Sequence, residues 1–554
     1  MQTKEVDIKM AEAGAEPTVL LPTVTQNLSG DLVAEAKDAT SFEHQMTPRQ
    51  ALKLYPKAVG WSILLSLAII MEGYDIVLLN SFYAFPAFVK KFGELQADGS
   101  YQVSAPWQAG LSNGALVGEI FGLLIAGVTS ERYGYRKTMI GALIAICGFV
   151  FIQFFAPNIQ TLQVAYILCG FPWGVFQTVT TTYAAEVCPI ALRAYLTTYV
   201  NLCWVIGQVI ASGVLRGMLS VENEWAYKAP YAIQWFWPVP IMIGVFFAPE
   251  SPWWLVRRGR TDAAAAAIDR LVSKTNHNFS TEQKVAMMIH TNEMERKISE
   301  GTSYFDCFKG TELRRTEIVS VVWSMQALCG SALMGYSTYF YQQAGLATNQ
   351  SFNFSLIQYA LGAFGTVFSW LLMTYCGRRT LYMYGMAVMF VLLLIIGFVS
   401  LAPESNAGAS WAIGSMLLVF TLVYDCTVGP VCYSLVAEIP STRLRSKSIV
   451  LARNVYNIGC IFNAIITPYM LNPTAWNWKG KTAFFWAGIN AILIVWTFFR
   501  LPEPKGLAYS ELNVLFERKV SARKFRTIAV DPFNGVKSDL DAPKAEVEMV
   551  EYVK

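Results

Sequence analysis

Long apolar runs alternate with short polar loops along most of the chain. An α-helix needs roughly twenty predominantly apolar residues to cross about 30 Å of hydrocarbon. Such runs are predicted at 58–83, 106–129, 138–156, 161–184, 195–217, 230–249, 317–341, 353–374, 380–401, 411–436, 448–471 and 481–500. The pattern therefore predicts an all-α membrane protein with twelve transmembrane helices.

A longer polar stretch separates the first six runs from the last six. This division predicts a cytoplasmic N-terminal tail over 1–57, a six-helix half over 58–249, a cytoplasmic linker over 250–316, a second six-helix half over 317–500 and a cytoplasmic C-terminal tail over 501–554. The linker is Ala-rich and charged in its middle, which favours partly helical structure.

Basic residues indicate the orientation, because Lys and Arg in short loops are retained on the cytoplasmic side. They gather after even-numbered runs, at Arg132, Arg136, Lys137, Arg193, Arg257, Arg258, Arg260, Arg378, Arg379, Arg443, Arg445 and Lys447. An even number of crossings then puts both termini in the cytoplasm. The first fifty-odd residues also lack the apolar core and cleavage site of a signal peptide.

Composition agrees with a chain that lies mostly in lipid. Hydrophobic residues make up 54% of it, charged residues 15%, and the mean hydropathy is +0.37. The net charge of +4 is small and dispersed, which argues against a nucleic-acid surface. We find no metal-ligand cluster, phosphate loop or nucleophile motif, so we expect neither an enzyme nor a cofactor.

Three landmarks of the first half recur in the second, in the same order and at nearly the same spacing. The pairs are Gly134-Tyr135-Arg136-Lys137 with Gly377-Arg378-Arg379, Glu186 with Glu438, and Pro249-Glu250 with Pro502-Glu503. In transporters built from parallel repeats, the substrate site lies near the bilayer midplane between the halves. The duplication therefore indicates transport by two pseudo-symmetric halves.

Four motifs carry a family resemblance over about 58 to 517. They are Glu72-Gly73-Tyr74-Asp75, Glu131-Arg132-Tyr133-Gly134-Tyr135-Arg136-Lys137, Thr427-Val428-Gly429-Pro430-Val431-Cys432-Tyr433, and the exit from Pro502 to Glu517. The chain resembles the sugar porter family of the major facilitator superfamily, and specifically the fungal maltose or α-glucoside proton symporters. The resemblance implies the major facilitator fold and import of an α-glucoside with a proton by alternating access. We expect a monomer in a fungal plasma membrane.

The chain departs from the wider family at four positions. Trp253 replaces an Arg, Thr374 an Asp, Tyr166 a fourth-helix Arg and Tyr433 the tenth-helix Trp. Tyr166 removes the usual cationic partner of the Gly-Tyr-Asp carboxylate, Asp75. Tyr433 agrees with the α-glucoside branch.

At least five ionisable side chains inside predicted spans are candidates for functional groups near the bilayer centre: Glu72, Asp75, Glu119, Asp425 and Arg453. Each costs about 2.5–3.5 kcal/mol at the bilayer centre, so a transporter retains one where it faces a cavity or a partner. We hypothesise that these residues couple proton and sugar movement. The alternative is a set of static ion pairs that hold helices together. Glu72 lies three residues before Asp75 and is expected to share roughly its helix face.

Histidine is excluded from that role, because His44, His277 and His290 lie in the tail or linker. The titrating groups must then be acids.

Sugar hydroxyls call for amide and hydroxyl partners, and the apolar ring face calls for an aromatic surface. By the family resemblance, the candidates are Asn201 on the fifth helix, Gln326 and Tyr336 on the seventh, Tyr433 on the tenth, and Asn454 and Asn457 on the eleventh. Ala327 and Ala332 replace family amides and make room for a second hexose ring. The alternatives are interhelical hydrogen bonds for the amides, worth about 0.6 kcal/mol each, and core packing for the tyrosines.

Charged loop residues form a predicted inner gate. Its acids are Glu131, Glu186 and Glu438, and its partners are Arg136, Arg193, Arg378 and Arg445. Such pairs would latch the inner side in one state and separate in the other. The alternative is that these arginines only orient the protein. Gly118, Gly122 and Gly127 are predicted to let the second helix approach its neighbour closely.

Two further readings of the function stay open. One is a symporter or facilitator for another sugar, such as a hexose, sucrose or trehalose. The other is a non-transporting sugar receptor, which the short C-terminal tail makes the weaker reading.

Overall fold

The computed structural model describes residues 46–526 apart from 97–98, 274–279, 300–302, 404–405, 442–443, 506 and 508, together with 35, 38–39, 42, 530–531 and 535–536. Within these ranges the side chains of 190, 193–195, 197–198, 294–299, 446 and 509–511 are not described. Arg193 is the predicted site residue that falls in the second group.

The first half is a bundle of helices that runs from α4 to α11. Its elements, with the short helix before them, are α3 (Pro48–Leu54), α4 (Pro56–Phe82), α5 (Pro86–Phe92), β1 (Glu94–Leu95), β2 (Tyr101–Gln102), α6 (Ala105–Tyr133), α7 (Tyr135–Phe154), α8 (Ile159–Val187), α9 (Ile190–Met218), α10 (Trp225–Ile233), η1 (Gln234–Phe236) and α11 (Pro238–Phe247). The strands β1 and β2 form one antiparallel hairpin.

The second half runs from α15 to α23 and follows a helical linker. The linker holds α12 (Pro252–Arg257), α13 (Thr261–Leu271), α14 (Thr281–Ser299) and η2 (Tyr304–Phe308). The second half holds α15 (Gly310–Leu328), α16 (Ala332–Gly335), α17 (Ser337–Gln343), α18 (Thr348–Tyr375), α19 (Arg378–Val399), α20 (Ala407–Cys426), α21 (Val428–Glu438), α22 (Arg445–Leu471), η3 (Lys479–Lys481) and α23 (Thr482–Arg500). The tail adds α24 (Tyr509–Glu517), η4 (Ala522–Lys524), β3 (Val530–Asp531) and β4 (Gly535–Val536).

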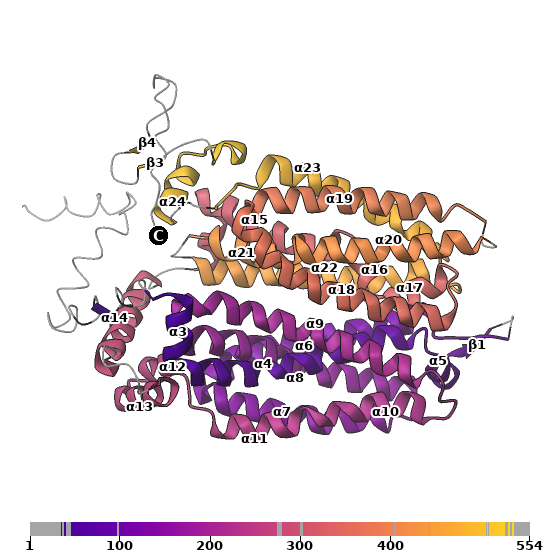
Figure 1. Ribbon diagram of the computed structural model, residues 1–554, viewed down its shortest axis with the longest axis horizontal. Coiled ribbons are helices and arrows are strands. Elements are labelled where there is room, and N and C mark those ends of the chain that lie inside the picture. The colour runs from indigo at the N-terminus through magenta and orange to yellow at the C-terminus, as the bar shows by residue number, and fades with distance from the viewer. Residues whose placement is uncertain are drawn as a thin grey trace, which may run out of the picture.

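Figure 1 shows the two halves as neighbouring layers whose long helices run along the same axis. The linker helices α12 to α14 lie at one end, together with α3 and α24, and α5 and β1 lie at the other. We call these the linker end and the far end. Chain segments that precede and follow the bundle therefore share one end, as an even number of crossings requires.

Eleven helices in the described part of the chain are long and apolar enough to cross a membrane, and they match eleven of the predicted runs. The predicted run 317–341 is the exception, because the described residues there do not form a helix that is long and apolar enough. It is divided into α15, α16 and α17. The break follows from Gly330, whose φ of 103° is a backbone conformation that glycine adopts without strain.

Close helix packing in the first half depends on small residues of α6. A Cβ on Gly118 or Gly122 would collide with the backbone of α8, at Ile167 and Phe171 respectively. Gly127 has open space around it, so the prediction that it allows close approach is wrong. It lies farther along α6, beyond the residues that approach α8 most closely.

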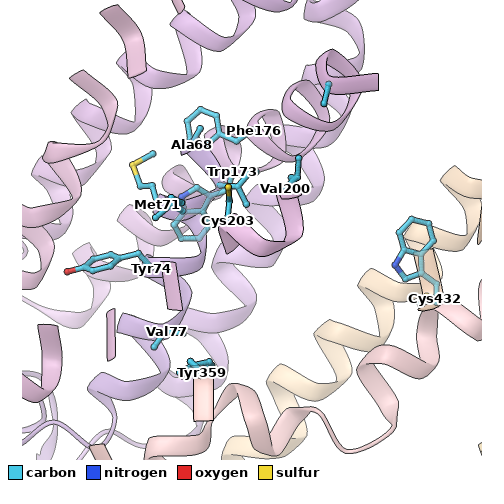
Figure 2. Close-up of a cluster of buried hydrophobic side chains, with 14 of the residues drawn as sticks. Ala68, Met71, Tyr74, Val77, Trp173, Phe176, Val200, Cys203, Tyr359 and Cys432 are labelled. Atoms are coloured by element: carbon cyan, nitrogen blue, oxygen red, sulfur yellow. The ribbon is translucent and has the colours of Figure 1, made fainter. Parts of the chain in front are cut away.

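A buried apolar cluster connects α4 with α8 and α9. Figure 2 shows Met71, Trp173 and Cys203 gathered between these helices, with Cys432 of the second half lying apart. Trp173 is 1% exposed, and Met71 and Cys203 are fully buried. Since Met71 immediately precedes Glu72, this packing holds the first acid of α4 at a fixed height in the bundle.

Candidate functional site

The two acids of α4 face different neighbours. Glu72 accepts a hydrogen bond from Nε2 of Gln177 on α8, at 2.6 Å. Asp75 accepts from Nε2 of Gln153 on α7 at 3.2 Å and from Nε2 of Gln234 on η1 at 2.8 Å. The expectation that both share one helix face is therefore corrected. Three helical steps leave the two side chains roughly 60° apart, which is enough to direct them to different helices.

Arg453 of α22 reaches from the second half into the first. Its Nη2 donates to Oε1 of Gln177 at 2.6 Å and lies 3.5 Å from Oε1 of Glu119 on α6. Glu72, Gln177, Arg453 and Glu119 thus form a continuous polar chain, which we call the bridging cluster. It joins α4, α6 and α8 to α22, and so ties the halves together through charge.

Aromatic rings surround the guanidinium of Arg453. Its Cζ lies 5.5 Å from the ring centroid of Trp323 and 4.8 Å from that of Tyr456, both in the range of cation–π attraction. Tyr433 meets Trp323 edge-on, with centroids 6.1 Å apart. Trp323 is 7% exposed whereas Tyr433 is 46% exposed, so Tyr433 has an accessible ring surface.

Asp75 lies in a second cluster confined to the first half, which we call the amide cluster. Its two partners are the carboxamides of Gln153 and Gln234, which themselves lie 3.5 Å apart. Tyr166, at the family's Arg position, makes a hydrogen bond of 3.1 Å with Tyr231 instead. Amide dipoles therefore solvate this fully buried carboxyl.

Asp425 is placed differently from the other acids, near the end of α20. Its side chain packs against α18, where a Cβ on Gly362 would lie 2.8 Å from its Oδ2 and a Cβ on Gly365 would lie 3.0 Å from its Cβ. The next turn is irregular, because Thr427 has φ −127° and ψ −83° and separates α20 from α21. Asp425 therefore belongs to neither the bridging nor the amide cluster.

The predicted sugar-binding residues do not form one cluster in this structure. Gln326 donates to the carbonyl of Gly429 at 2.6 Å, within the second half. Tyr336 instead crosses to α6 and donates to Oγ of Ser112 at 2.9 Å. The asparagines differ in burial: Asn457 is buried, Asn201 is half-buried and Asn454 is exposed.

Hydrogen bonds between the halves gather toward the far end, where α5, β1 and α17 lie (Figure 1). Besides Tyr336 with Ser112, these are Asn80 with Gly335 at 3.1 Å, Ser81 with Thr338 at 3.0 Å, Tyr339 with Gln102 at 3.3 Å, Asn472 with Val103 at 2.8 Å and Arg216 with Asn353 at 2.6 Å. We call this set the far-end seal. It holds the two halves together on the side away from the linker.

Two gate acids at the linker end pair with arginines that do not belong to the opposite half: Glu186 with Arg257 of the linker helix α12, and Glu438 with Arg378 of its own half. Glu186 lies 2.8 Å from Nη2 of Arg257 and accepts from the hydroxyl of Tyr135 at 3.0 Å. Glu438 lies 3.3 Å from Nη2 of Arg378. Sequence reasoning treated Arg257 only as a marker of orientation, although its position after the Pro-Glu signature could have suggested a role.

Other predicted gate residues are engaged differently. The carbonyl of Glu131 accepts from Nε1 of Trp254 at 2.8 Å, while its side chain is exposed. The guanidinium of Arg136 lies 5.3 Å from the ring centroid of Phe246. Arg445 is the first residue of α22 and is half-buried.

The two Pro-Glu signatures bind the starts of α7 and α19. Glu250 accepts from the backbone N–H of Tyr135 at 3.0 Å, and Glu503 accepts from those of Arg378 at 2.8 Å and Arg379 at 3.1 Å. Burial raises the pKa of Glu250, and the N–H donors of Ser251, Arg136 and Tyr135 oppose that rise. Carboxylates at helix N-termini are favourable electrostatically, so both signatures fix the loops that carry the gate residues.

Sequence reasoning missed the glutamines that hold the acids. Gln153, Gln177 and Gln234 all lie inside membrane-spanning segments. A carboxamide in the hydrocarbon region also needs a hydrogen-bond partner. A search for partners among all polar residues inside the predicted spans, and not only among the charged ones, would have identified these glutamines as candidates.

Comparison with known proteins agrees with this architecture. A family model described as "Sugar (and other) transporter" matches residues 61–516. The general alpha-glucoside permease of Saccharomyces cerevisiae is 45% identical over 515 residues, which cover 92% of this chain and 83% of that protein. The maltose permease MAL31 of the same yeast is 42% identical over 564 residues, which cover 99% and 91%.

Among solved structures, the xylose transporter XylE from E. coli in a partially occluded inward open conformation matches with a TM-score of 0.67. It is 17% identical, and the match covers 82% of this chain and 100% of that chain. At this identity the likeness carries the fold alone. The chain therefore belongs to the sugar transporter family, as a multi-pass membrane protein with the twelve-helix major facilitator fold that moves sugar and is not an enzyme.

Proposed function

We propose that this sugar transporter imports α-glucosides, maltose foremost, together with a proton across the plasma membrane. It works by alternating access, as a monomer, with both termini in the cytoplasm. Relatives named as alpha-glucoside and maltose permeases support the substrate class, because they are 40–45% identical over nearly the whole chain.

The bridging cluster is the observation that carries the proton coupling. Glu72 is 1% exposed and Glu119 is 6% exposed, and both depend on the one guanidinium of Arg453. When both acids are ionised, the cluster carries a net charge of about −1, which is costly inside a membrane protein. Binding of one proton makes the cluster neutral. The cluster can therefore bind a proton from one side of the membrane and release it to the other side.

The energy available suits a concentrating transporter. One proton that moves down about 100 mV supplies about 2.3 kcal/mol, which concentrates a neutral sugar roughly fifty-fold. Asp75 and Asp425 are further candidates for proton binding. Both lie in membrane-spanning helices, and neither belongs to the bridging cluster that contains Arg453.

For the sugar, we assign stacking to Tyr433 and hydrogen bonding to the amides of Asn201, Gln326, Asn454 and Asn457. The accessible ring of Tyr433 next to Trp323 supports the first role, since sugar rings pack on aromatic faces. Tyr336, which lies in the far-end seal, would contact sugar only when that seal opens.

For the gate, we assign Glu186 and Glu438 the role of holding the linker end of each half as a rigid unit. Their pairing with Arg257 of the linker helix α12 and with Arg378 of the second half supports this reading, because neither pair joins the two halves. Glu131, Arg136, Arg193 and Arg445 are proposed to join contacts between the halves in the opposite state of the cycle.

The test is uptake by a yeast strain that lacks its own α-glucoside transporters. Cells in a weakly buffered suspension receive maltose, and the external pH is recorded together with sugar accumulation. Alkalinisation with maltose and not with glucose is expected. Accumulation of maltose without any pH change would indicate a facilitator, the same response to glucose, sucrose or trehalose alone would indicate another sugar, and binding without uptake would indicate a receptor.

A further inference from the structure

Gln177 occupies the middle of the bridging cluster, between an acid of one half and the cation of the other. We propose that Gln177 is a positioning residue that passes the protonation state of Glu72 to Arg453. The inference rests on the proton coupling proposed above, and it identifies Glu72 as the acid of the cluster that exchanges the proton.

The geometry of the carboxamide assigns each of its ends. A glutamine side chain has donors on Nε2 and an acceptor at Oε1. Nε2 donates to Glu72 at 2.6 Å while Oε1 accepts from Nη2 of Arg453, also at 2.6 Å. A rotated amide would present Oε1 to the carboxylate and Nε2 to the guanidinium, and would lose both bonds. The observed orientation therefore suits an ionised Glu72.

Protonation of Glu72 changes the balance within the cluster. A hydronium ion gives up a proton: one of its O–H bonds breaks, an O–H bond forms on the carboxyl, a water molecule is left, and the cluster gains one positive charge. The bond from Nε2 is then no longer charge-assisted, so it is weaker and holds the amide less firmly. Arg453 keeps Glu119 as its one ionised partner and is drawn toward α6. Because Arg453 belongs to α22, this shift acts on the packing of one half against the other.

Glu72 depends on the glutamine more than Glu119 does. Arg453 lies 3.5 Å from Glu119, whereas the hydrogen bonds that join it to Glu72 run through Gln177, and its charge acts on Glu72 through space as well. The other groups that face this part of the cluster are Trp204 from α9, Cys432 and Tyr433 from α21, and Tyr456 and Cys460 from α22. None of these adds a second cation, so the amide is the hydrogen-bonded link between Glu72 and positive charge.

A purely structural role for Gln177 would be a polar contact between helices. Loss of such a contact would impair folding and lower the amount of transporter in the membrane. Uptake would then fall by the same factor at every pH. A role in positioning predicts instead that two substitutions move the pH profile in opposite directions.

The experiment compares Gln177→Leu and Gln177→Glu with the unaltered transporter. Uptake of labelled maltose is measured as a function of external pH. A second assay measures exchange of internal for external maltose at the same pH on both sides of the membrane. This exchange needs no net proton movement. The control is Gln163→Leu, on the same helix, because Gln163 donates to the carbonyl of Gly110 inside the first half.

Gln177→Leu removes the donor that favours ionised Glu72, so Glu72 keeps its proton and releases it slowly inside. Proton-driven uptake is expected to fall roughly tenfold and its alkaline limb to move about one unit to higher pH, while exchange stays within about twofold. Gln177→Glu reproduces the donor and acceptor only when its new carboxyl is protonated. It should transport at acidic pH and lose uptake as the pH rises. Gln163→Leu should keep the normal profile.

Unchanged pH profiles in both Gln177 variants, with uptake merely scaled, would overturn the inference. Loss of exchange along with uptake would also overturn it, because Gln177 would then serve sugar binding. Glutamate has nearly the same size and shape as glutamine, so Gln177→Glu is expected to fold normally. Its pH profile alone therefore tests the inference even if Gln177→Leu fails to reach the membrane. If the unaltered transporter shows no alkalinisation with maltose, the proton coupling itself fails, which is a separate result.

Discussion

The bridging cluster and the amide cluster begin one helical turn apart on α4, yet they are built differently. Glu72 is connected through Gln177 to a cation of the other half, whereas Asp75 is held by two amides of its own half. A charge held across an interface responds when the halves move. A charge solvated inside one half has no such contact across the interface. Two acids of one motif, three residues apart, are therefore held by different elements, and only one of them is connected to the other half.

The largest effect is expected from Arg453→Leu, which removes the cation of the bridging cluster. Glu72 and Glu119 would remain buried without a countercharge, and breaking a buried pair in this way costs about 3–5 kcal/mol. Accumulation of maltose should disappear and the thermal stability of the purified protein should drop. Arg453→Lys is the control, because it keeps the charge and should retain part of the stability. Normal accumulation in Arg453→Leu would mean that the cluster is not needed for coupling.

A second effect separates the two acids. Glu72→Gln keeps an acceptor for Gln177 but cannot exchange a proton, so uptake should lose its dependence on external pH and no longer concentrate maltose. Asp75→Asn should spare sugar binding and keep more of the dependence on external pH than Glu72→Gln does, because its amide partners belong to one half. Both variants are measured by accumulation against pH and by maltose binding. If Asp75→Asn accumulates maltose normally, Asp75 has a structural role and the two clusters differ even more than proposed.

Removing one donor from the amide cluster should be milder. Gln234→Leu leaves Asp75 with the longer bond from Gln153, at 3.2 Å, and a lost hydrogen bond to a charged group costs about 1.5–3 kcal/mol. The melting temperature should fall. The ratio of maltose exchange to proton-driven uptake should change little, because this cluster does not cross between the halves. A large change in the ratio of exchange to proton-driven uptake would show that the amide cluster also takes part in proton coupling.

The smallest effect is expected from Tyr336→Phe in the far-end seal. The substitution keeps the ring, which stacks with Tyr83 at a centroid distance of 6.3 Å, and removes the bond to Ser112. A neutral hydrogen bond contributes about 1 kcal/mol, so the far end should open several-fold more often. Labelling of an Asn80→Cys variant by a membrane-impermeant reagent measures this. Unaltered labelling would place the closing contacts elsewhere in the seal.

Much of the fold could be predicted because a membrane selects strongly on hydropathy. Eleven of the runs are spanning helices of the described chain, and both Glu186 and Glu438, which recur at matching positions, form ion pairs with arginines. The break in the seventh run could not be predicted, because hydropathy marks 317–341 as one run. The interruption depends on the conformation of Gly330, which hydropathy does not report.

Less of the site could be predicted. The intramembrane acids were identifiable because each carries an insertion cost that needs a reason. Their partners were not, because Gln153, Gln177 and Gln234 come from three different elements. The three-residue step from Glu72 to Asp75 on α4 changes which of those elements the acid faces.

Hydropathy and repeated motifs alone were enough to predict two related sets of membrane-spanning helices with acids and Arg453 inside them. Length and apolarity are local properties, and the lipid environment acts on them residue by residue. The link from Glu72 through an amide to Arg453, and the separate amide partners of Asp75, became known from the folded arrangement of the helices. Such pairings depend on the rotation of each helix about its axis and on which helices become neighbours, and both are set by packing over the whole bundle.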